Sequence, residues 1–414
     1  MSTAVDALIV GGGPAGLAAA LELRRGGVAR VLVVDREEAA GGVPRHSVHT
    51  GFGLRDLHRM MSGPRYAAHY VGRARDAGVE IRAAATVTGW IGPTVVALTS
   101  PAGLDEVSAR AILLATGCRE RPRAARLVPG TRPLGVLTTG ALQQAVYTHR
   151  QPVGRRAVVV GAEHVSFSAV LTLAHAGVET VALVTEHPRD QTVPPFRWLT
   201  TTRWRVPILT SSRVTQILGA RRVEAVEVTN ARTGAVDHLA CDTVVFTGDW
   251  IADHELARRG GLEMEPTTRA PRVDLALRTS ARGVFAAGNL LHGAETADVA
   301  ALSGLHAGRA MRDFLRSGDW PTRAPLPLRC SAPLRWVSPN AVSGRSGRPP
   351  RGHFILRADA FCPARELVVS QGDAVLWRER HRRLIPNRPL HLSAAWVDRV
   401  DLDGPAVVIG AAPP

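Results

Sequence analysis

The sequence predicts an α/β protein with two three-layer, doubly wound domains and a small β-rich domain near its C-terminal end. Two strand–turn–helix runs predict the first two domains, one beginning near residue 5 and the other near residue 157. Short alternating apolar segments separated by Pro and Gly predict the third domain over residues 330–414. A chain of 414 residues is long enough for two or three such domains, each with its own core.

Residues 5–10, VDALIV, predict a buried strand, and the run PAGLAAALELRR that follows the turn predicts a helix. Between them, Gly11, Gly13 and Gly16 have the spacing G-x-G-x-x-G. The first glycine allows a tight turn, the second lets the backbone approach a pyrophosphate, and the third lets the helix pack close to the strand. Because the N-terminus of the helix supplies N–H groups and a positive dipole, we expect phosphates to bind there.

A second predicted strand, VLVV at 31–34, supports this interpretation. It ends in Asp35, 19 residues after Gly16, where a carboxylate accepts hydrogen bonds from ribose hydroxyls in dinucleotide-binding domains. Strand, glycines, helix, strand and acid together predict a dinucleotide site more strongly than the glycines alone.

Later segments indicate which dinucleotide binds. AILLATG ends in Thr116 and Gly117, GVFAAGN ends in Gly288 and Asn289, and a predicted helix follows from Ala297. With EEAAGG at 37–42, this order resembles the FAD-dependent oxidoreductases with two Rossmann-like domains, which include the pyridine nucleotide-disulfide reductases. The resemblance implies that a second domain is inserted in the first. It also implies FAD as the ligand of a set of residues in the first domain: Gly11, Gly13, Gly16, Asp35, Gly41, Gly42, Thr116, Gly117, Gly288, Asn289 and Ala297.

Two features of this set concern the flavin end. Most members of the family carry Asp where this chain has Asn289, and we expect the amide still to bond a ribityl hydroxyl. The resemblance also implies that the helix from Ala297 directs its N-terminus at the flavin, although the segment alone is equally typical of a packing helix.

The redox cysteine pair of the disulfide reductases is missing. In GGVPRHSVH, Pro44 and His49 stand at its two positions, so disulfide reduction by that route is not expected. His46 and His49 are therefore the candidate catalytic residues near the flavin, with bonding to loop backbone as the alternative. Four separated cysteines and no third ligand for the histidines predict no metal site.

The second strand–turn–helix run keeps only one of the three glycines. Gly161 matches the first, but Glu163 and Ser166 replace the second and third. Serine is small enough for close packing, whereas a carboxylate would repel a pyrophosphate and cap the helix itself. Glu186 stands 20 residues after Ser166 and suits either a ribose contact or a solvated strand end. NAD(P) binding is thus left open, with the residues arguing against it.

Long phrases such as GNLLHGAETADVAALSG further resemble the flavoprotein alpha-type subunits of multicomponent dehydrogenases for sarcosine, opines and glycerol 3-phosphate. The resemblance implies an electron-transferring subunit that works with a second flavoprotein and an iron–sulfur or other carrier on a small amine, amino acid or polyol. Two alternatives remain. The chain could be a self-sufficient NAD(P)H-dependent flavin reductase, or a catalytically idle flavin-binding subunit with a structural role.

The expected domain boundaries follow from these segments. Residues 1–119 and 281–318 form the FAD domain, 120–280 the inserted NAD(P)-binding-like domain, 319–329 a linker and 330–414 the β-rich domain. All 51 basic residues are arginine and the net charge is +15, yet no nucleic-acid recognition motif accompanies them. No signal-peptide pattern or apolar run of about 18 residues occurs, so we expect a cytoplasmic protein without a membrane span.

Overall fold

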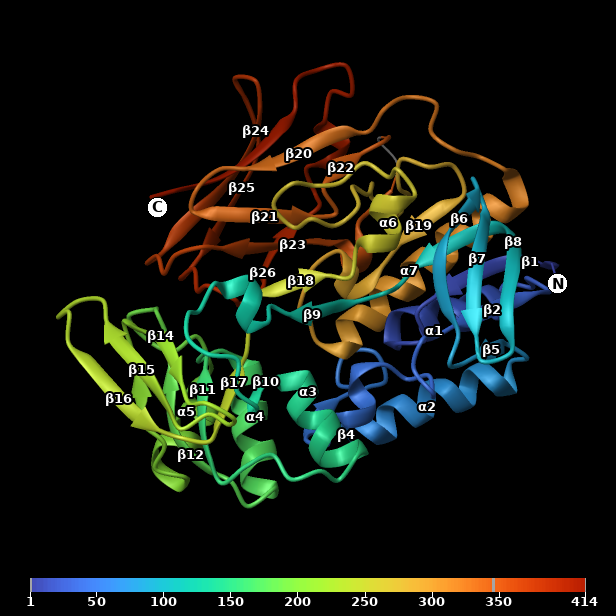
Figure 1. Ribbon diagram of the computed structural model, residues 1–414. Coiled ribbons are helices and arrows are strands. Elements are labelled where there is room, and N and C mark those ends of the chain that lie inside the picture. The colour runs from blue at the N-terminus through green and yellow to red at the C-terminus, as the bar shows by residue number, and fades with distance from the viewer. Residues whose placement is uncertain (1, 345–346, 414) are drawn as a thin grey trace. The chain divides into compact units, whose positions relative to one another are not determined.

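The computed structural model describes residues 2–344 and 347–413. Residues 1, 345, 346 and 414, which fall within the predicted first and C-terminal domains, lie outside the described residues. The chain divides into two units. Unit 1 comprises Met1–Arg45, Thr50–Cys118 and Ala252–Pro414, and unit 2 comprises His46–His49 and Arg119–Ile251. Two α/β units on one chain agree with the predicted fold class (Figure 1).

A parallel sheet forms the centre of unit 1. Its strands follow the order β5-β2-β1-β8, with β19 beside the last part of β8. The first part of β8 also pairs with β7 in an antiparallel meander that continues to β6. The strands are β1 (Ser2–Val10), β2 (Val31–Val34), β5 (Glu80–Arg82), β6 (Thr86–Gly92), β7 (Val95–Ser100), β8 (Gly103–Leu114) and β19 (Val284–Ala286), and β3 (Thr50–Phe52) pairs separately with β4 (Met61–Ser62).

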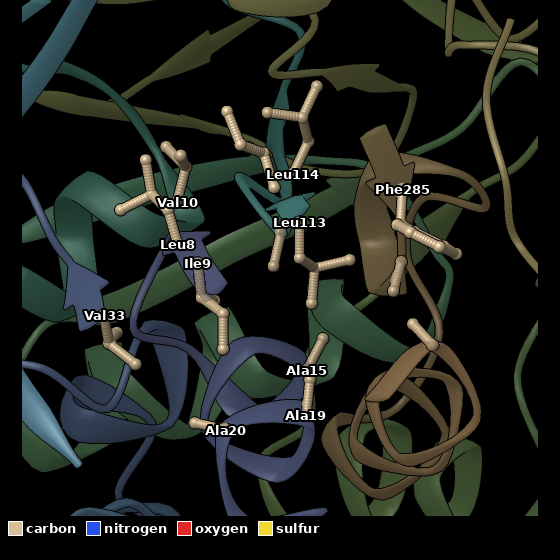
Figure 2. Close-up of a cluster of buried hydrophobic side chains, with 14 of the residues drawn as sticks. Leu8, Ile9, Val10, Ala15, Ala19, Ala20, Val33, Leu113, Leu114 and Phe285 are labelled. Atoms are coloured by element: carbon tan, nitrogen blue, oxygen red, sulfur yellow. The ribbon is translucent and has the colours of Figure 1, made fainter. Parts of the chain in front are cut away.

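Helices α1 (Pro14–Arg25) and α7 (Ala297–Ser317) pack against each other beside this sheet. Small residues allow the contact: a Cβ added to Gly304 would lie 1.9 Å from the Ala15 carbonyl oxygen, and one added to Gly308 would lie 2.9 Å from that of Ala19. Figure 2 shows Ala15 and Ala19 on α1 below the strand residues Leu113 and Leu114. This close packing places the first turn of α1 against the second turn of α7, around Gly304. The remaining helices of unit 1 are α2 (Gly63–Asp76) and α6 (Glu255–Arg259).

The chain leaves unit 1 through β9 (Cys118–Glu120) and returns through β18 (Trp250–Ala252), which pairs with it. The sequence prediction placed this return near residue 281, some 30 residues too late. Residues 253–280 carry little regular structure, so they lack the periodicity that marks an element. They nevertheless bury Leu256, Leu262 and Val273 in the core of unit 1.

Strands in the C-terminal part of unit 1 form one five-stranded sheet, in the order β22-β20-β27-β24-β25, and one three-stranded sheet, β21-β23-β26. The five-stranded sheet contains β20 (Leu326–Cys330), β22 (Ala341–Val342), β24 (Arg365–Gln371), β25 (Ala374–His381) and β27 (Val407–Ala412). The three-stranded sheet contains β21 (Leu334–Ser338), β23 (His353–Ala358) and β26 (Leu390–Ser393). Because β20 begins at Leu326, the predicted linker 319–329 already includes part of a strand. These sheets belong to unit 1, together with the central parallel sheet.

Unit 2 is also built on a parallel sheet, in the order β10-β17-β11-β12-β13. The strands of this sheet are β10 (Val136–Thr138), β11 (Arg156–Val160), β12 (Glu179–Val184), β13 (Ile208–Leu209) and β17 (Thr243–Phe246). An antiparallel sheet adds β14 (Ser212–Leu218), β15 (Ala225–Asn230) and β16 (Val236–Ala240), and the helices are α3 (Thr139–Gln143), α4 (His164–His175) and α5 (Pro194–Trp198). Among the described residues, no helix combines the length and apolarity that crossing a membrane requires.

Candidate functional site

The turn between β1 and α1 requires glycine at two positions for steric reasons. Gly11 has φ +110°, and a Cβ there would lie 2.3 Å from the Ala115 carbonyl oxygen. A Cβ on Gly16 would lie 1.9 Å from the Gly11 carbonyl oxygen. Neither distance is possible for a real side chain, so these two glycines set the path of the turn and the approach of α1 to the sheet.

Gly13 has a different environment. As the N-cap residue of α1 it has φ −82° and ψ −174°, which any residue can adopt, and no side chain caps the helix. A Cβ at Gly13 would meet only the Gly42 Cα, at 3.8 Å. The space beside Gly13 is therefore open, and the N–H groups in the first turn of α1 are available to an anion.

Asp35 holds this turn in shape. One carboxylate oxygen accepts a hydrogen bond from the Gly12 N–H at 2.8 Å, and the other accepts one from the Glu37 N–H at 2.9 Å. The residue is 8% exposed, and burial raises its pKa above the ordinary value for aspartate. The sequence predicted a ribose contact for Asp35; the geometry adds a structural role, and each carboxylate oxygen keeps a further lone pair for a ligand.

Gly41 and Gly42 close the other side of the turn. The Gly41 N–H donates to the Gly12 carbonyl oxygen at 2.7 Å. Gly42 has φ +63°, and a Cβ there would lie 2.9 Å from the Gly13 Cα. The structure thus brings together Gly13, Asp35 and the Gly41–Gly42 pair, and their role in binding FAD stays a prediction.

Gly288 and Asn289 form a short turn after β19, close to the start of α1. A Cβ on Gly288 would lie 2.6 Å from the Ala15 Cβ. The Asn289 amide is occupied on both sides: its Nδ2 donates to the Glu295 carbonyl oxygen, and its Oδ1 accepts from the Glu295 N–H, both at 2.9 Å. The sequence predicted that Asn289 bonds a ribityl hydroxyl. These loop contacts give a different reason for asparagine in place of aspartate at position 289, because a carboxylate could not donate a hydrogen bond to the Glu295 carbonyl oxygen.

Thr116 and Gly117 lie where β8 ends. The Thr116 hydroxyl donates to the Asp253 carbonyl oxygen at 2.7 Å, and the Gly117 carbonyl accepts from the Asp253 N–H at 3.0 Å. Both residues therefore anchor the chain where it returns to unit 1. Together with Ala297, the first residue of α7, the predicted first-site residues all lie in unit 1.

The open space beside Gly13 has room for part of a dinucleotide. It lies at the uncapped N-terminus of α1, next to Asp35, and any side chain at Gly13 would enter it. Such a cradle suits a pyrophosphate and an attached ribose. The residues present therefore fit a dinucleotide of the FAD type.

The candidate catalytic histidines belong to unit 2. The segment His46–His49 is part of unit 2, although the residues on either side of it belong to unit 1. The Ser47 hydroxyl in this segment donates to the Gln143 side-chain oxygen at 3.1 Å. His46 is buried and His49 is partly buried. Their catalytic role stays a prediction.

All four cysteines are free thiols, at positions 118, 241, 330 and 362. Burial raises the pKa of Cys241 to about 11 and that of Cys330 to about 12, which keeps both protonated at neutral pH. In the stretches 2–344 and 347–413, no group of three or more His, Cys, Asp and Glu side chains has an arrangement that could hold a metal ion.

The equivalent turn in unit 2 has the same backbone and a different side chain. Glu163 is the N-cap residue of α4 with φ −98° and ψ −179°, close to the values at Gly13. Glu163 and Ser166 stand in the arrangement of a capping box, and the Ser166 hydroxyl accepts from the Glu163 N–H at 3.2 Å. A side chain of α4 thus bonds the N–H of its own N-cap residue, and no described side chain makes such a contact at the start of α1.

The Glu163 side chain lies against the end of β17. The residue is 6% exposed, and a Cβ on Gly248 would lie 3.0 Å from its carboxylate carbon. Its Oε1 is buried and has no hydrogen-bond partner among the described residues. Beside it, the Ser166 and Thr247 hydroxyls are hydrogen-bonded at 2.6 Å. The carboxylate therefore fills space that the corresponding turn of unit 1 leaves open.

Sequence reasoning missed the residues that surround Glu163. The Arg126 guanidinium donates to the carbonyl oxygens of Thr247 and Gly248, at 2.7 and 2.8 Å. A signal was available, because VVFTG at 244–248 repeats the pattern of ILLATG at 112–117. Glu186 is exposed beyond the end of β12, and both of its interpretations, a ribose contact or a solvated strand end, stay predictions.

Comparison with known proteins agrees with this architecture. Residues 5–304 match the family model of the pyridine nucleotide-disulphide oxidoreductases. Thioredoxin reductase from T. acidophilum superposes with a TM-score of 0.65 at 20% identity, covering 76% of this chain and 99% of that one. L-proline dehydrogenase from P. horikoshii superposes with a TM-score of 0.57 at 19% identity, covering 76% of this chain and 56% of that one. Both share the fold of two nucleotide-binding domains.

Curated relatives are more varied in length. The ferredoxin–NADP reductase of Ignicoccus hospitalis is 28% identical over 76% of this chain and 99% of its own length. The alpha subunit of sarcosine oxidase from Rhizobium meliloti is 28% identical over 74% of this chain but only 30% of its own length. An opine oxidase subunit from the same species is 27% identical over 71% of this chain and 60% of its own length. The matched family segment covers most of the chain and contains both turns. The protein therefore belongs to the pyridine nucleotide-disulphide oxidoreductase family and is an oxidoreductase.

Proposed function

We propose that the protein is an FAD-dependent oxidoreductase whose electrons come from a partner protein or a small amine, amino acid or polyol, and not from NAD(P)H. The observation that carries this proposal is the contrast between the two turns. Gly13 leaves the N-terminus of α1 open, and Glu163 occupies the same position at α4 with a buried carboxylate. One turn suits a pyrophosphate, and the other repels it.

The roles of the residues in unit 1 follow from their contacts. FAD would supply the capacity to take up and release electrons. The first-turn N–H groups of α1 would bind its pyrophosphate, and Asp35 would hold a ribose while keeping the Gly12 N–H fixed. The first turn of α7 differs from that of α1, because it carries the buried Asp298, whose carboxylate accepts from the Val299 N–H at 2.9 Å and offsets part of the helix dipole.

The names of its relatives support the proposal that this chain works with a partner subunit. The matched chains of sarcosine oxidase, opine oxidase and hydrogen cyanide synthase are all named as subunits of larger enzymes. A second flavoprotein that oxidises the substrate, with an iron–sulfur or other carrier, is the corresponding arrangement for this chain.

A second candidate function has one observation in its favour. The ferredoxin–NADP reductase match extends over 99% of that protein, so an NAD(P)H-dependent flavin reductase is the alternative. It requires the turn at Glu163 to accept a dinucleotide.

Anaerobic spectroscopy distinguishes the two candidates. The purified protein, loaded with FAD, is mixed with NADH or NADPH while the visible flavin absorbance is recorded, and dithionite serves as the positive control for reduction. We expect bleaching by dithionite and none by either nucleotide within minutes. Rapid bleaching by NADH or NADPH would refute the proposed electron source, and failure to bind FAD would refute the flavin assignment itself.

A further inference from the structure

A buried ion pair joins the C-terminal strands to the loop before α7. Arg357 in β23 donates from its guanidinium to the Glu295 carboxylate at 2.6 Å. The Arg357 side chain is 7% exposed and that of Glu295 is 4% exposed. Desolvating two charges is costly, so such a pair adds little net stability, and its best-supported role is to specify one geometry.

Glu295 is the residue that closes the loop beginning at Gly288. Its N–H and carbonyl oxygen are the two groups that bond the Asn289 amide, and it directly precedes Thr296, the N-cap of α7. The place of Glu295 therefore sets both the turn that packs on the start of α1 and the direction of the first N–H groups of α7.

Arg357 is itself held by contacts from the same strands. Its guanidinium lies over the ring of Trp336 in β21, 5.2 Å from the centroid. Trp336 also packs with Ile355 and with Val299 in the first turn of α7. Loop, helix and C-terminal strands are thus fixed to one another around a single guanidinium.

We propose that Arg357 is a positioning residue for the flavin, through which the C-terminal strands complete the FAD site. These strands, from Leu326 onward, lie beyond the segment 5–304 that matches the family model, so the family's own architecture does not supply this contact. Without Arg357, the buried Glu295 carboxylate loses its partner and the loop leaves its binding-competent conformation for part of the time. The apparent FAD affinity falls by the competent fraction. This inference rests on the proposed FAD site and holds whichever donor reduces the flavin.

The test measures FAD affinity separately from fold stability. FAD is removed from the full-length protein with a chaotrope, and rebinding is followed by quenching of FAD fluorescence. Far-UV circular dichroism and the Tm of each apoprotein are recorded in parallel. Arg357→Met is compared with Arg357→Lys, which keeps the charge. The control is Arg348→Met, the same change at an exposed pair with Asp398.

We expect FAD to bind at least about tenfold more weakly to Arg357→Met than to the wild type, with partial recovery in Arg357→Lys and none of the loss in Arg348→Met. Unchanged FAD affinity in a folded Arg357→Met variant would overturn the proposal, whatever its Tm. If that variant does not fold, Glu295→Gln replaces it, because it removes the carboxylate charge from the buried pair and keeps the volume of the side chain. A folded Glu295→Gln protein with wild-type FAD affinity would also overturn the proposal, and several-fold weaker binding would support it. A wild-type protein that binds no FAD would instead refute the proposed function.

Discussion

Replacing Glu163 tests whether one carboxylate closes the second nucleotide turn. The residue stands at the N-cap position of α4, is 6% exposed, and lies against Gly248 with Oε1 unpaired among the described residues. Glu163→Gly restores the glycine that Gly13 supplies in unit 1, where the backbone angles are nearly the same. Glu163→Gln removes the charge and keeps most of the volume. The pair of variants therefore separates repulsion from steric exclusion.

The size of the effect follows from the charge. A carboxylate about 4 Å from a phosphate charge costs about 4 kcal/mol at an effective dielectric of about 20, which is roughly a thousandfold in affinity. Glycine at an N-cap position costs only a few tenths of a kcal/mol in helix stability, so Glu163→Gly should remain folded. We expect it to bind NADH roughly a hundred- to a thousandfold more tightly than the wild type. Glu163→Gln should show a smaller gain.

Equilibrium dialysis or calorimetry with NADH and NADPH measures these constants, with FAD already bound so that the first turn is filled. Thermal unfolding of each variant serves as the control for folding. If Glu163→Gly and the wild type bind NADH within about threefold, a difference below about 1 kcal/mol, then Glu163 is not what closes the turn.

Three further predictions concern unit 1. Gly16→Ala places a Cβ 1.9 Å from the Gly11 oxygen, so we expect about 1–3 kcal/mol of lost stability and reduced FAD retention; a wild-type Tm would contradict this. Asn289→Asp removes the donor to the Glu295 carbonyl and should cost about 1–3 kcal/mol in denaturant unfolding; a more stable variant would refute the loop role. Burial lowers the pKa of His292 below 6.5, so the unfolded chain binds more protons and stability should fall as pH drops below about 6.5. His292→Asn should flatten that decline, and an unchanged pH profile of Tm would exclude His292 as its source.

Local patterns made the backbone geometry of the first turn predictable from sequence. The clash that requires Gly16 involves the oxygen of Gly11, only five residues away, and the cap position of Gly13 lies in the same turn. Asp35 is separated from the turn by one helix and one strand, the regular span of this motif. The same logic applied to the second turn, where Glu163 stands out because its neighbours otherwise repeat the first.

Contacts between distant segments were beyond sequence reasoning. Arg357 lies 62 residues after Glu295 and belongs to no motif, so their pairing follows only from the packing of β23 beside the loop. The return of the chain at Ala252 was missed because residues 253–280 bury apolar side chains without a regular period. The loop contacts of Asn289 were missed for the same reason, since its partner Glu295 lies across a loop.

Gly13→Glu tests the central claim most directly, because it places in the first turn the residue that occupies the second. A side chain at Gly13 has room, since its Cβ would meet only the Gly42 Cα at 3.8 Å, and the φ of −82° carries no strain. The measurement is the FAD content of the purified, folded protein after gel filtration. We predict stoichiometric FAD in the wild type and almost none in Gly13→Glu. Full FAD retention in a folded Gly13→Glu variant would contradict the claim that the residue at this position decides whether a turn binds a dinucleotide.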